Sequence, residues 1–399
     1  MAERRFVVAG TFIDGSGADV RRGVFLEVTN GSISSIGPAA DLPSAGGAVI
    51  DDFSHCIILP ALFDCSVSLS RLPSVDGRAR ASFEKATPAQ KAAIVGQHIL
   101  YCHMHGLLGV ADCDDMTNLV KGYQDEATQG GLIDVCTSGR LYRSMEDCAD
   151  GNAADNDYLK IAYSNSVESE DLSPFRLDYA DLCRLLEHRG QKKAVVVANG
   201  RQMVDEAVEA GCDAIEQGYG MGEDTLRKMA DKNVLWIPSL LRAKNALDGS
   251  CAGGTVCCRF SHRYVAPGKP RPGAEAFWKK RLSEQLTKLQ YARKIGVRTA
   301  IGTGAGSAGI LHGESIVEEM KLFVRAGYSL EETIRCASET GARFFGVEKL
   351  GMLAVGRSAT FLVARGTIPQ LPRKLSYLEG IFVDGKPSST YRKNPVKTL

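Results

Sequence analysis

Residues 56–68 read Cys-Ile-Ile-Leu-Pro-Ala-Leu-Phe-Asp-Cys-Ser-Val-Ser. An apolar run of this length, which contains β-branched residues and stops at small polar ones, is typical of a buried parallel strand whose carboxyl end opens into a site. Along such a strand Asp64, Ser66 and Ser68 point to one face, and Cys65 and Val67 point to the other. The stretch therefore predicts an α/β fold with a pocket at the end of this strand.

The middle of the chain repeats this combination of strand and helix. A helical pattern covers residues 89–104, and an apolar strand pattern follows at 106–113. Further strand patterns lie at residues 132–136, 157–162, 194–198, 212–217, 234–238 and 297–302. Eight strands with helices between most of them predict a (β/α)8 TIM-like barrel. An open doubly wound sheet is the structural alternative, but no glycine-rich phosphate-binding motif follows any of these strands.

Both ends of the chain have the pattern of antiparallel β structure. Residues 5–30 alternate apolar and polar positions, with Asp14-Gly15 and Asn30-Gly31 as turn signals. Short strands and a turn recur at residues 359–363 and 380–386. Two β-rich ends around an α/β middle predict that both termini fold into one small β-sandwich. The predicted domains are residues 1–56 and 346–399, the two parts of the sandwich, and residues 57–345, the barrel.

The composition excludes several classes of function. The 399 residues carry 48 Lys and Arg against 47 Asp and Glu, so no net charge favours nucleic acid or an anionic membrane as a partner. The N-terminal apolar segment is too short for a signal peptide, and no later window has the length and hydrophobicity of a membrane span. These features lead us to expect a cytoplasmic protein.

Twelve cysteines are scattered along the chain rather than spaced as a disulfide framework, which predicts reduced and buried thiols. A local cluster, Cys251, Cys257, Cys258 and His262, has no CxxC pair, so a zinc site there is disfavoured. The surrounding segment, residues 240–277, is predicted to be a long loop. It is either a lid or wall of the site, or an insertion without catalytic role.

Several segments together resemble the metal-dependent amidohydrolase superfamily, in particular its imidazolonepropionase and prolidase-like branch. They are Leu59–Asp64, Gly109–Asp114, Ala207–Glu216, Ile301–Thr303, Leu350–Arg357 and Val383–Lys386, and their order spans nearly the whole chain. The resemblance implies a barrel flanked by a composite sandwich, with one or two divalent ions at the mouth of the barrel. In that family the ions activate water for hydrolysis.

The family's metal ligands are replaced in this sequence. Ser66 and Ser68 stand at the positions of the His-x-His pair on the first strand, and a neutral hydroxyl is a poor ligand for such ions. The positions of the other ligands on strands five, six and eight hold Val197, Asn199, Gln217 and Gly304. Lys160 alone matches the lysine that the branch uses to bridge two metals. The resemblance therefore implies a member without a metal centre or another cofactor.

The pocket that remains is polar and carries one amine. We expect it to be lined, and a ligand to be bound, by Ser66, Ser68, Asn199, Gln217, Tyr219, Thr303 and His312. Lys160 either has a lowered pKa and acts as a base or imine former, or it makes a structural ion pair with a carboxylate. His312 either reaches a ligand or only caps and packs a helix. The pair His103-x-His105 is predicted to end a helix rather than to bind metal.

These observations predict an amidohydrolase-like protein without the metal centre. It would be a non-hydrolytic pseudoenzyme that binds a polar small molecule, or a metal-free enzyme that uses the barrel mouth. The alternative is a hydrolase for C–N bonds other than peptide bonds, with a cyclic amide or acyl-amino substrate. A homodimer is an expectation from the family alone.

Overall fold

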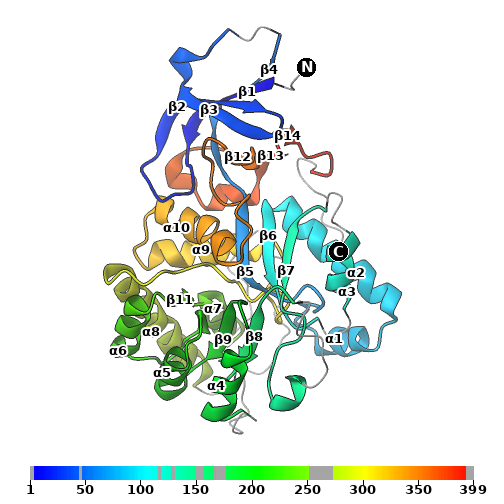
Figure 1. Ribbon diagram of the computed structural model, residues 1–399, viewed down its shortest axis with the longest axis vertical. Coiled ribbons are helices and arrows are strands. Elements are labelled where there is room, and N and C mark those ends of the chain that lie inside the picture. The colour runs from blue at the N-terminus through cyan, green and yellow to red at the C-terminus, as the bar shows by residue number, and fades with distance from the viewer. Residues whose placement is uncertain are drawn as a thin grey trace.

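Both ends of the chain meet in one sheet at one end of the molecule (Figure 1). The computed structural model describes residues 4–44, 47–115, 118–126, 131–148, 156–165, 167, 177–250 and 273–391. The strands of this terminal sheet are β1 (Arg4–Phe12), β2 (Arg21–Thr29), β3 (Ser32–Pro38), β4 (Val49–Pro60), β12 (Phe361–Arg365), β13 (Leu378–Val383) and β14 (Lys386–Pro387). Their order is β14-β13-β12-β4-β1-β2-β3, so the two termini are joined through the pairing of β12 with β4.

The terminal sheet has a hydrophobic cluster of its own, to which strands from both ends of the chain contribute. Val7, Leu26, Ile58, Phe361 and Phe382 are among its buried members. The predicted hairpins and the joining of the termini are confirmed. The prediction of a two-sheet sandwich is wrong in one respect. The seven strands form a single hydrogen-bonded sheet, because β4 pairs with β1 on one side and with β12 on the other.

The stretch at residues 56–68 belongs to two successive strands rather than one. Cys56–Pro60 ends β4 in the terminal sheet, and β5 (Leu62–Val67) begins the parallel part of the fold. The buried Ala61 lies at the junction. Cys65 packs against a helix, since a Cβ placed on Gly341 would lie 2.6 Å from its Sγ. The predicted orientation of Cys65 is therefore correct.

Parallel strands follow in two groups, with helices along the outside. One sheet has the order β5-β6-β7 and the other β11-β10-β9-β8. The new strands are β6 (Leu107–Asp112), β7 (Asp134–Thr137), β8 (Leu159–Ala162), β9 (Ala194–Ala198), β10 (Ala214–Gln217) and β11 (Leu235–Ile237). The helices are α1 (Gly77–Glu84), α2 (Pro88–Met104), α3 (Leu119–Glu126), α4 (Tyr179–Glu187), α5 (Arg201–Glu209), α6 (Glu223–Asp231), α7 (Leu240–Ser250), α8 (Ala274–Lys294), α9 (Ser315–Arg325), α10 (Leu330–Cys336) and α11 (Glu339–Phe344).

The α/β class and seven of the predicted parallel strands are confirmed, but the described strands do not form one continuous sheet. The eighth predicted strand, residues 297–302, makes a single isolated bridge, between Thr299 and Trp236. Its backbone still bonds on both sides. The Trp236 N–H donates to the Arg298 carbonyl at 2.9 Å, and the Cys65 N–H donates to the Ile301 carbonyl at 2.9 Å. The segment thus lies between β11 and β5.

The helix predicted at residues 89–104 and the loop predicted at residues 240–277 have different outcomes. The helix predicted at residues 89–104 is confirmed as α2, which starts at a capping box of Thr87 and Gln90 with Pro88 at its first position. The loop predicted at residues 240–277 is wrong at both ends, because α7 and α8 occupy them. The cluster of Cys251, Cys257, Cys258 and His262 lies outside the described residues. None of the described helices is long and apolar enough to span a membrane.

Candidate functional site

A cavity of about 160 Å³ opens where β5, β8 and β10 end. Carboxyl ends of parallel strands are where α/β folds of this kind bind ligands. Its lining contains four cationic and two anionic side chains among polar and small residues. The lining residues are Ser66, Val67, Ser68, Arg71, Cys113, Asp114, Leu141, Arg143, Lys160, Ala162, Ser164, Val197, Glu216, Gln217, Arg242, Gly304 and Ser307.

A buried ion pair lies at the base of this cavity. Lys160 Nζ is 2.7 Å from Glu216 Oε2, and each side chain is only 3% exposed. The Ser66 hydroxyl donates to Glu216 Oε1 at 2.9 Å and accepts a longer bond of 3.4 Å from Lys160 Nζ. The Cys113 thiol lies 3.3 Å from the same ammonium group. Three strands thus place an amine, a carboxylate and a hydroxyl in direct contact.

The ion pair decides the charge of Lys160. Burial lowers the pKa of the ammonium group, but the charge and the hydrogen bond of the Glu216 carboxylate outweigh it, so the pKa of Lys160 is raised above its ordinary value. Burial raises the pKa of the neighbouring Cys113 thiol, which favours its neutral form. A lysine with a raised pKa is neither a base nor a free amine for imine formation at neutral pH. Of the two readings of Lys160, the geometry supports the structural ion pair.

Thr303 lies behind the cavity rather than in its wall. Its hydroxyl donates to Asp64 Oδ2 at 2.5 Å and its N–H donates to Asp64 Oδ1 at 2.9 Å. Burial raises the pKa of Asp64 to about 6, against the lowering effect of these hydrogen bonds. The pair fixes the end of β5 to the extended segment beside it, so Thr303 supports the wall and is not among the lining residues.

Asn199 and Gln217 lie together, as the sequence predicts for the pocket. Asn199 Nδ2 donates to Gln217 Oε1 at 2.7 Å, and Asn199 Oδ1 accepts from the Tyr219 N–H at 3.0 Å. Only Gln217 lines the cavity. Tyr219 is 3% exposed and its hydroxyl donates to the Ser239 carbonyl at 2.8 Å. The prediction that Tyr219 lines the pocket and binds a ligand has no support from this position, because the ring is packed into the core.

The predicted residues Ser68 and His312 contact each other through the backbone of Ser68. The Ser68 carbonyl lies 3.0 Å from His312 Nε2. Ser68 also lines the cavity, and its hydroxyl lies 3.5 Å from Cys113 Sγ. His312 is buried and stacked on His98, with ring centroids 3.9 Å apart, and His98 Nδ1 lies 2.8 Å from the Leu69 carbonyl. The histidine pair thus holds the chain that follows β5, and His312 packs rather than lines the cavity.

The pair at residues 103 and 105 ends α2, as predicted. His103 Nδ1 lies 2.8 Å from the Leu132 carbonyl and its Nε2 lies 2.7 Å from the Ser388 hydroxyl. His105 Nδ1 instead lies 2.8 Å from the carbonyl of Tyr101 in the same helix. The two imidazoles therefore have separate structural partners.

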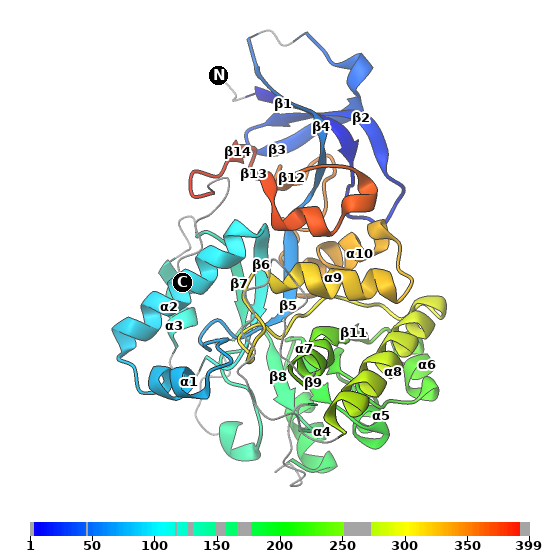
Figure 2. The same cartoon turned by 180° about the vertical axis from the view of Figure 1, so that it is seen from behind.

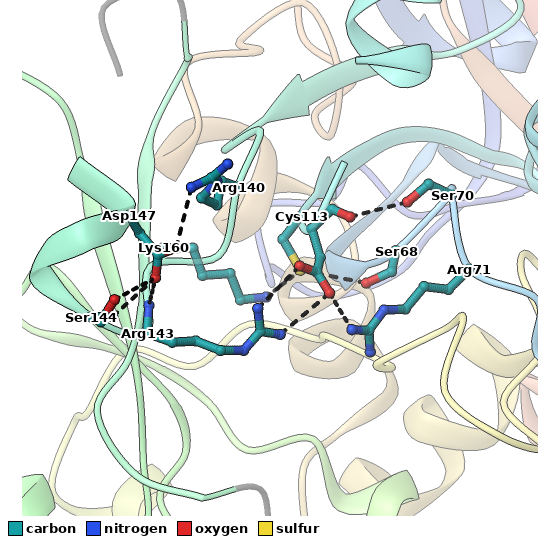
Figure 3. A network of polar contacts seen from close by, with 10 residues as sticks. Ser68, Ser70, Arg71, Cys113, Arg140, Arg143, Ser144, Asp147 and Lys160 are labelled. Atoms are coloured by element: carbon teal, nitrogen blue, oxygen red, sulfur yellow. Dashed lines mark hydrogen bonds and ion pairs between the residues drawn. The ribbon is translucent and has the colours of Figure 1, made fainter. Parts of the chain in front are cut away.

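Arginines at the mouth of the cavity are residues that the sequence did not reveal. Figure 3 shows Arg71 and Arg143 approaching from opposite sides, and both pair with the Asp114 carboxylate, which is 5% exposed. Both Nη atoms of Arg143 lie 3.4 Å from this carboxylate. Asp114 has a φ of +71°, an unfavourable conformation for a residue with a side chain, which these ion pairs help to hold. The one available signal was the acidic run Asp112-Cys113-Asp114-Asp115 at the end of a strand.

A further arginine occupies the space beside Gly304. A Cβ placed on Gly304 would lie 2.9 Å from Arg242 Nη1, and the φ of Gly304 is +73°. A larger side chain at this position would therefore be strained and would displace the guanidinium group. Arg242 takes the room that an acidic side chain at position 304 would need.

Comparison with known proteins fits this architecture. The family model described as "Amidohydrolase family" matches residues 176–394, which is more than half of the chain. The chain belongs to the amidohydrolase family. Among curated proteins, uncharacterized proteins of Mycobacterium tuberculosis and Mycobacterium bovis are 28% identical over 139 residues, which is 35% of this chain and 33% of theirs. The match thus spans about a third of those relatives.

Solved structures share the fold of this amidohydrolase at low identity. A Xaa-Pro dipeptidase with bound methionine has a TM-score of 0.79 and 19% identity, over 96% of this chain and 99% of that one. The A. niger ochratoxinase has a TM-score of 0.77 and 16% identity, over 97% and 95%. Molinate hydrolase has a TM-score of 0.76 and 16% identity, over 98% and 95%. At these identities the likeness concerns the fold.

The family implies a divalent metal ion at the ends of these strands, so the donors present must be tested against it. In the part of the chain that the structure describes, no group of three or more His, Cys, Asp and Glu side chains is placed to hold such an ion. The cavity offers the hydroxyls of Ser66 and Ser68, while Glu216 is already paired with Lys160. Hydroxyls are weak ligands and an ammonium group repels cations. The described residues of this amidohydrolase do not fit the metal.

Proposed function

We propose that this amidohydrolase binds a small polar molecule in the cavity and does not hydrolyse substrates through a metal ion. The observation that carries the proposal is the ion pair between Lys160 and Glu216 at 2.7 Å, which places a fixed cation among the strand ends. The Arg242 guanidinium beside Gly304 adds a second cation. The Lys160 ammonium group and the Arg242 guanidinium group both attract anionic ligands and oppose the binding of a divalent cation.

We further infer that the two parallel sheets and residues 298–305 make up a (β/α)8 barrel. Backbone bonds between the segments support this arrangement. Between β7 and β8, the Tyr142 N–H donates to the Lys160 backbone carbonyl at 3.0 Å. On the other side, the Gly304 N–H donates to the Ser66 backbone carbonyl at 2.8 Å, and the Ser68 N–H donates to the Ala305 carbonyl at 2.8 Å. Such a barrel would present the cavity at its carboxyl face, the usual ligand face of this fold.

The charges of the lining suggest which ligands would fit. Arg71, Arg143, Arg242 and Lys160 exceed the two carboxylates, Asp114 and Glu216, by two formal charges. Arg71 and Arg143 share one carboxylate, so a ligand carboxylate can exchange with it as a partner for their guanidinium groups. A small molecule with a carboxylate and further hydrogen-bond acceptors is the ligand that we expect.

A second candidate function is hydrolysis of a C–N bond without metal, on a cyclic amide or acyl-amino substrate. The contact from the Ser66 hydroxyl to Glu216 Oε1 favours it, because a carboxylate that accepts the hydroxyl proton can activate the oxygen as a nucleophile. Attack by Ser66 Oγ on the carbonyl carbon would form an ester, and the proton held by Glu216 would pass to the departing amine. Water would then release the acid.

Hydrolysis assays on N-acetyl amino acids, dipeptides and a cyclic amide, each with added zinc and after chelation, test both candidates. We expect no turnover above that of buffer in either condition. Turnover that requires zinc and is lost on chelation would overturn the proposal. Metal-independent turnover that disappears in Ser66→Ala, while the fold and melting temperature are kept, would establish the second candidate instead.

A further inference from the structure

A second cavity, of about 240 Å³, lies at the opposite end of the parallel strands. Arg298 lines it, and the Nη2 of this residue donates to the carbonyl of Asn233, which precedes β11, at 2.9 Å. Gly304, at the other end of the same extended segment, lines the first cavity. The lining residues of the second cavity are Arg293, Gly296, Val297, Arg298, Thr299, Tyr328, Glu332, Arg335, Glu339, Thr340 and Arg343. The two cavities share no lining residue.

The second cavity gathers positive charge from several separate elements. Arg293 comes from α8, Arg335 from α10 and Arg343 from α11, and Figure 2 shows α8 and α10 on the same side of the molecule. With Arg298, four guanidinium groups face two carboxylates, Glu332 and Glu339. The formal excess is therefore two positive charges around one small volume.

Two of the four arginines are paired and two are not. Arg293 Nε lies 3.0 Å and 2.8 Å from the two oxygens of Glu332, and Arg343 Nη1 lies 3.5 Å from Glu339. Within the described residues, Arg298 and Arg335 have no carboxylate at ion-pair distance, and Arg298 donates only to a backbone carbonyl. These two guanidinium groups have the donors that an anion would use.

The crowding of cations supports an anionic ligand. Burial, and then the like charge of Arg343, lower the pKa of Arg298. Tyr328 closes one wall, with its hydroxyl 3.1 Å from Thr299 Oγ1 and its ring beneath the Arg293 guanidinium at 5.9 Å. An anion placed between the arginines would relieve this repulsion and accept forked hydrogen bonds.

We propose that this cavity binds the phosphate group of a small molecule through Arg298 and Arg335. A phosphate monoester carries between one and two negative charges near neutral pH, which matches the formal excess of two. Guanidinium groups bind phosphate oxygens in a bidentate manner, and the paired Arg293 and Arg343 complete the positive surround. The proposal is independent of the function proposed for the first cavity.

Binding of inorganic phosphate tests the site, measured by calorimetric titration and by melting at constant ionic strength with chloride as the reference salt. We expect saturable binding and a raised melting temperature for the wild type. The double variant Arg298→Gln/Arg335→Gln should bind phosphate at least roughly tenfold more weakly, since it removes the charged hydrogen bonds of both guanidinium groups. Arg78→Gln, at an exposed position of α1, is the matched control and should bind as the wild type does.

The first cavity is also cationic, so Arg143→Gln serves as a second comparison. Under the proposal it keeps phosphate binding, because Arg143 lies in the other cavity. Loss of binding in Arg143→Gln, with binding retained in Arg298→Gln/Arg335→Gln, would place phosphate in the first cavity and overturn the proposal. Phosphate effects no greater than those of chloride in the wild type would overturn it as well.

Discussion

Replacement of Glu216 by glutamine is expected to lower the free energy of unfolding by about 3–5 kcal/mol at pH 7, the cost of leaving a buried charge without its partner. Lys160 is 2% exposed and its ammonium group would lose the carboxylate at 2.7 Å. The chain could instead release the proton of Lys160, but at pH 7 this costs about 5 kcal/mol for a group with an ordinary pKa near 10.4. Denaturant unfolding followed by circular dichroism measures the loss.

A double-variant cycle separates the ion pair from general disruption. Lys160→Met/Glu216→Gln removes both charges and should recover a large part of the loss, because no uncompensated charge remains. Glu223→Gln, in an exposed ion pair of α6, is the matched control, with an expected change below about 1 kcal/mol. If Glu216→Gln changes stability no more than this control does, Lys160 and Glu216 are not a buried ion pair.

Acidification is expected to reduce the contribution that the stacked pair His98 and His312 makes to the free energy of unfolding. Burial lowers the pKa of His98 to about 4, and burial together with the like charge of His98 lowers the pKa of His312 well below its ordinary value. Above pH 6.5 both imidazole rings are neutral in the folded chain and in the unfolded chain. Below pH 6.5 these histidines take up protons in the unfolded chain first, so the contribution of His98 to the free energy of unfolding falls by about 3 kcal/mol down to about pH 4.

Buried carboxyl groups act in the opposite sense, so the histidine contribution must be measured as a difference. Burial raises the pKa of Asp64 to about 6 and that of Glu319 to about 8. These groups lose stabilisation as the pH rises from about 4 through those values. The stability difference between wild type and His98→Phe should therefore shrink by about 3 kcal/mol from pH 7 to pH 4. A constant difference would contradict the assignment, and the exposed His55→Gln is the surface control.

Much of the fold was predictable because its signals are local. Alternation and turn residues such as Asn30-Gly31 predicted the terminal strands, and Thr87 with Gln90 begins the predicted helix α2. The eighth strand was not predictable as it stands, because residues 297–302 bond to both neighbours without forming regular pairs. The join of β4 to β5 was likewise hidden, since one apolar run serves both strands.

The candidate site was predictable only in part because its contacts are long-range. Strand parity predicted that Ser66 faces the pocket, and the family resemblance placed Lys160 there, but Glu216 pairs with Ser66 across 150 positions of sequence. No local pattern states that this carboxylate would take up the ammonium group of Lys160. Arg71 and Arg143 come from irregular segments, whose direction depends on the tertiary structure rather than on periodicity.

Elemental analysis of the purified protein, before and after chelation, tests the central claim most directly. The arrangement of Lys160, Glu216 and Arg242 predicts no stoichiometric divalent metal and no change in melting temperature when a chelator is added. Stoichiometric zinc or a similar metal, removed by chelation together with a hydrolytic activity, would contradict the account.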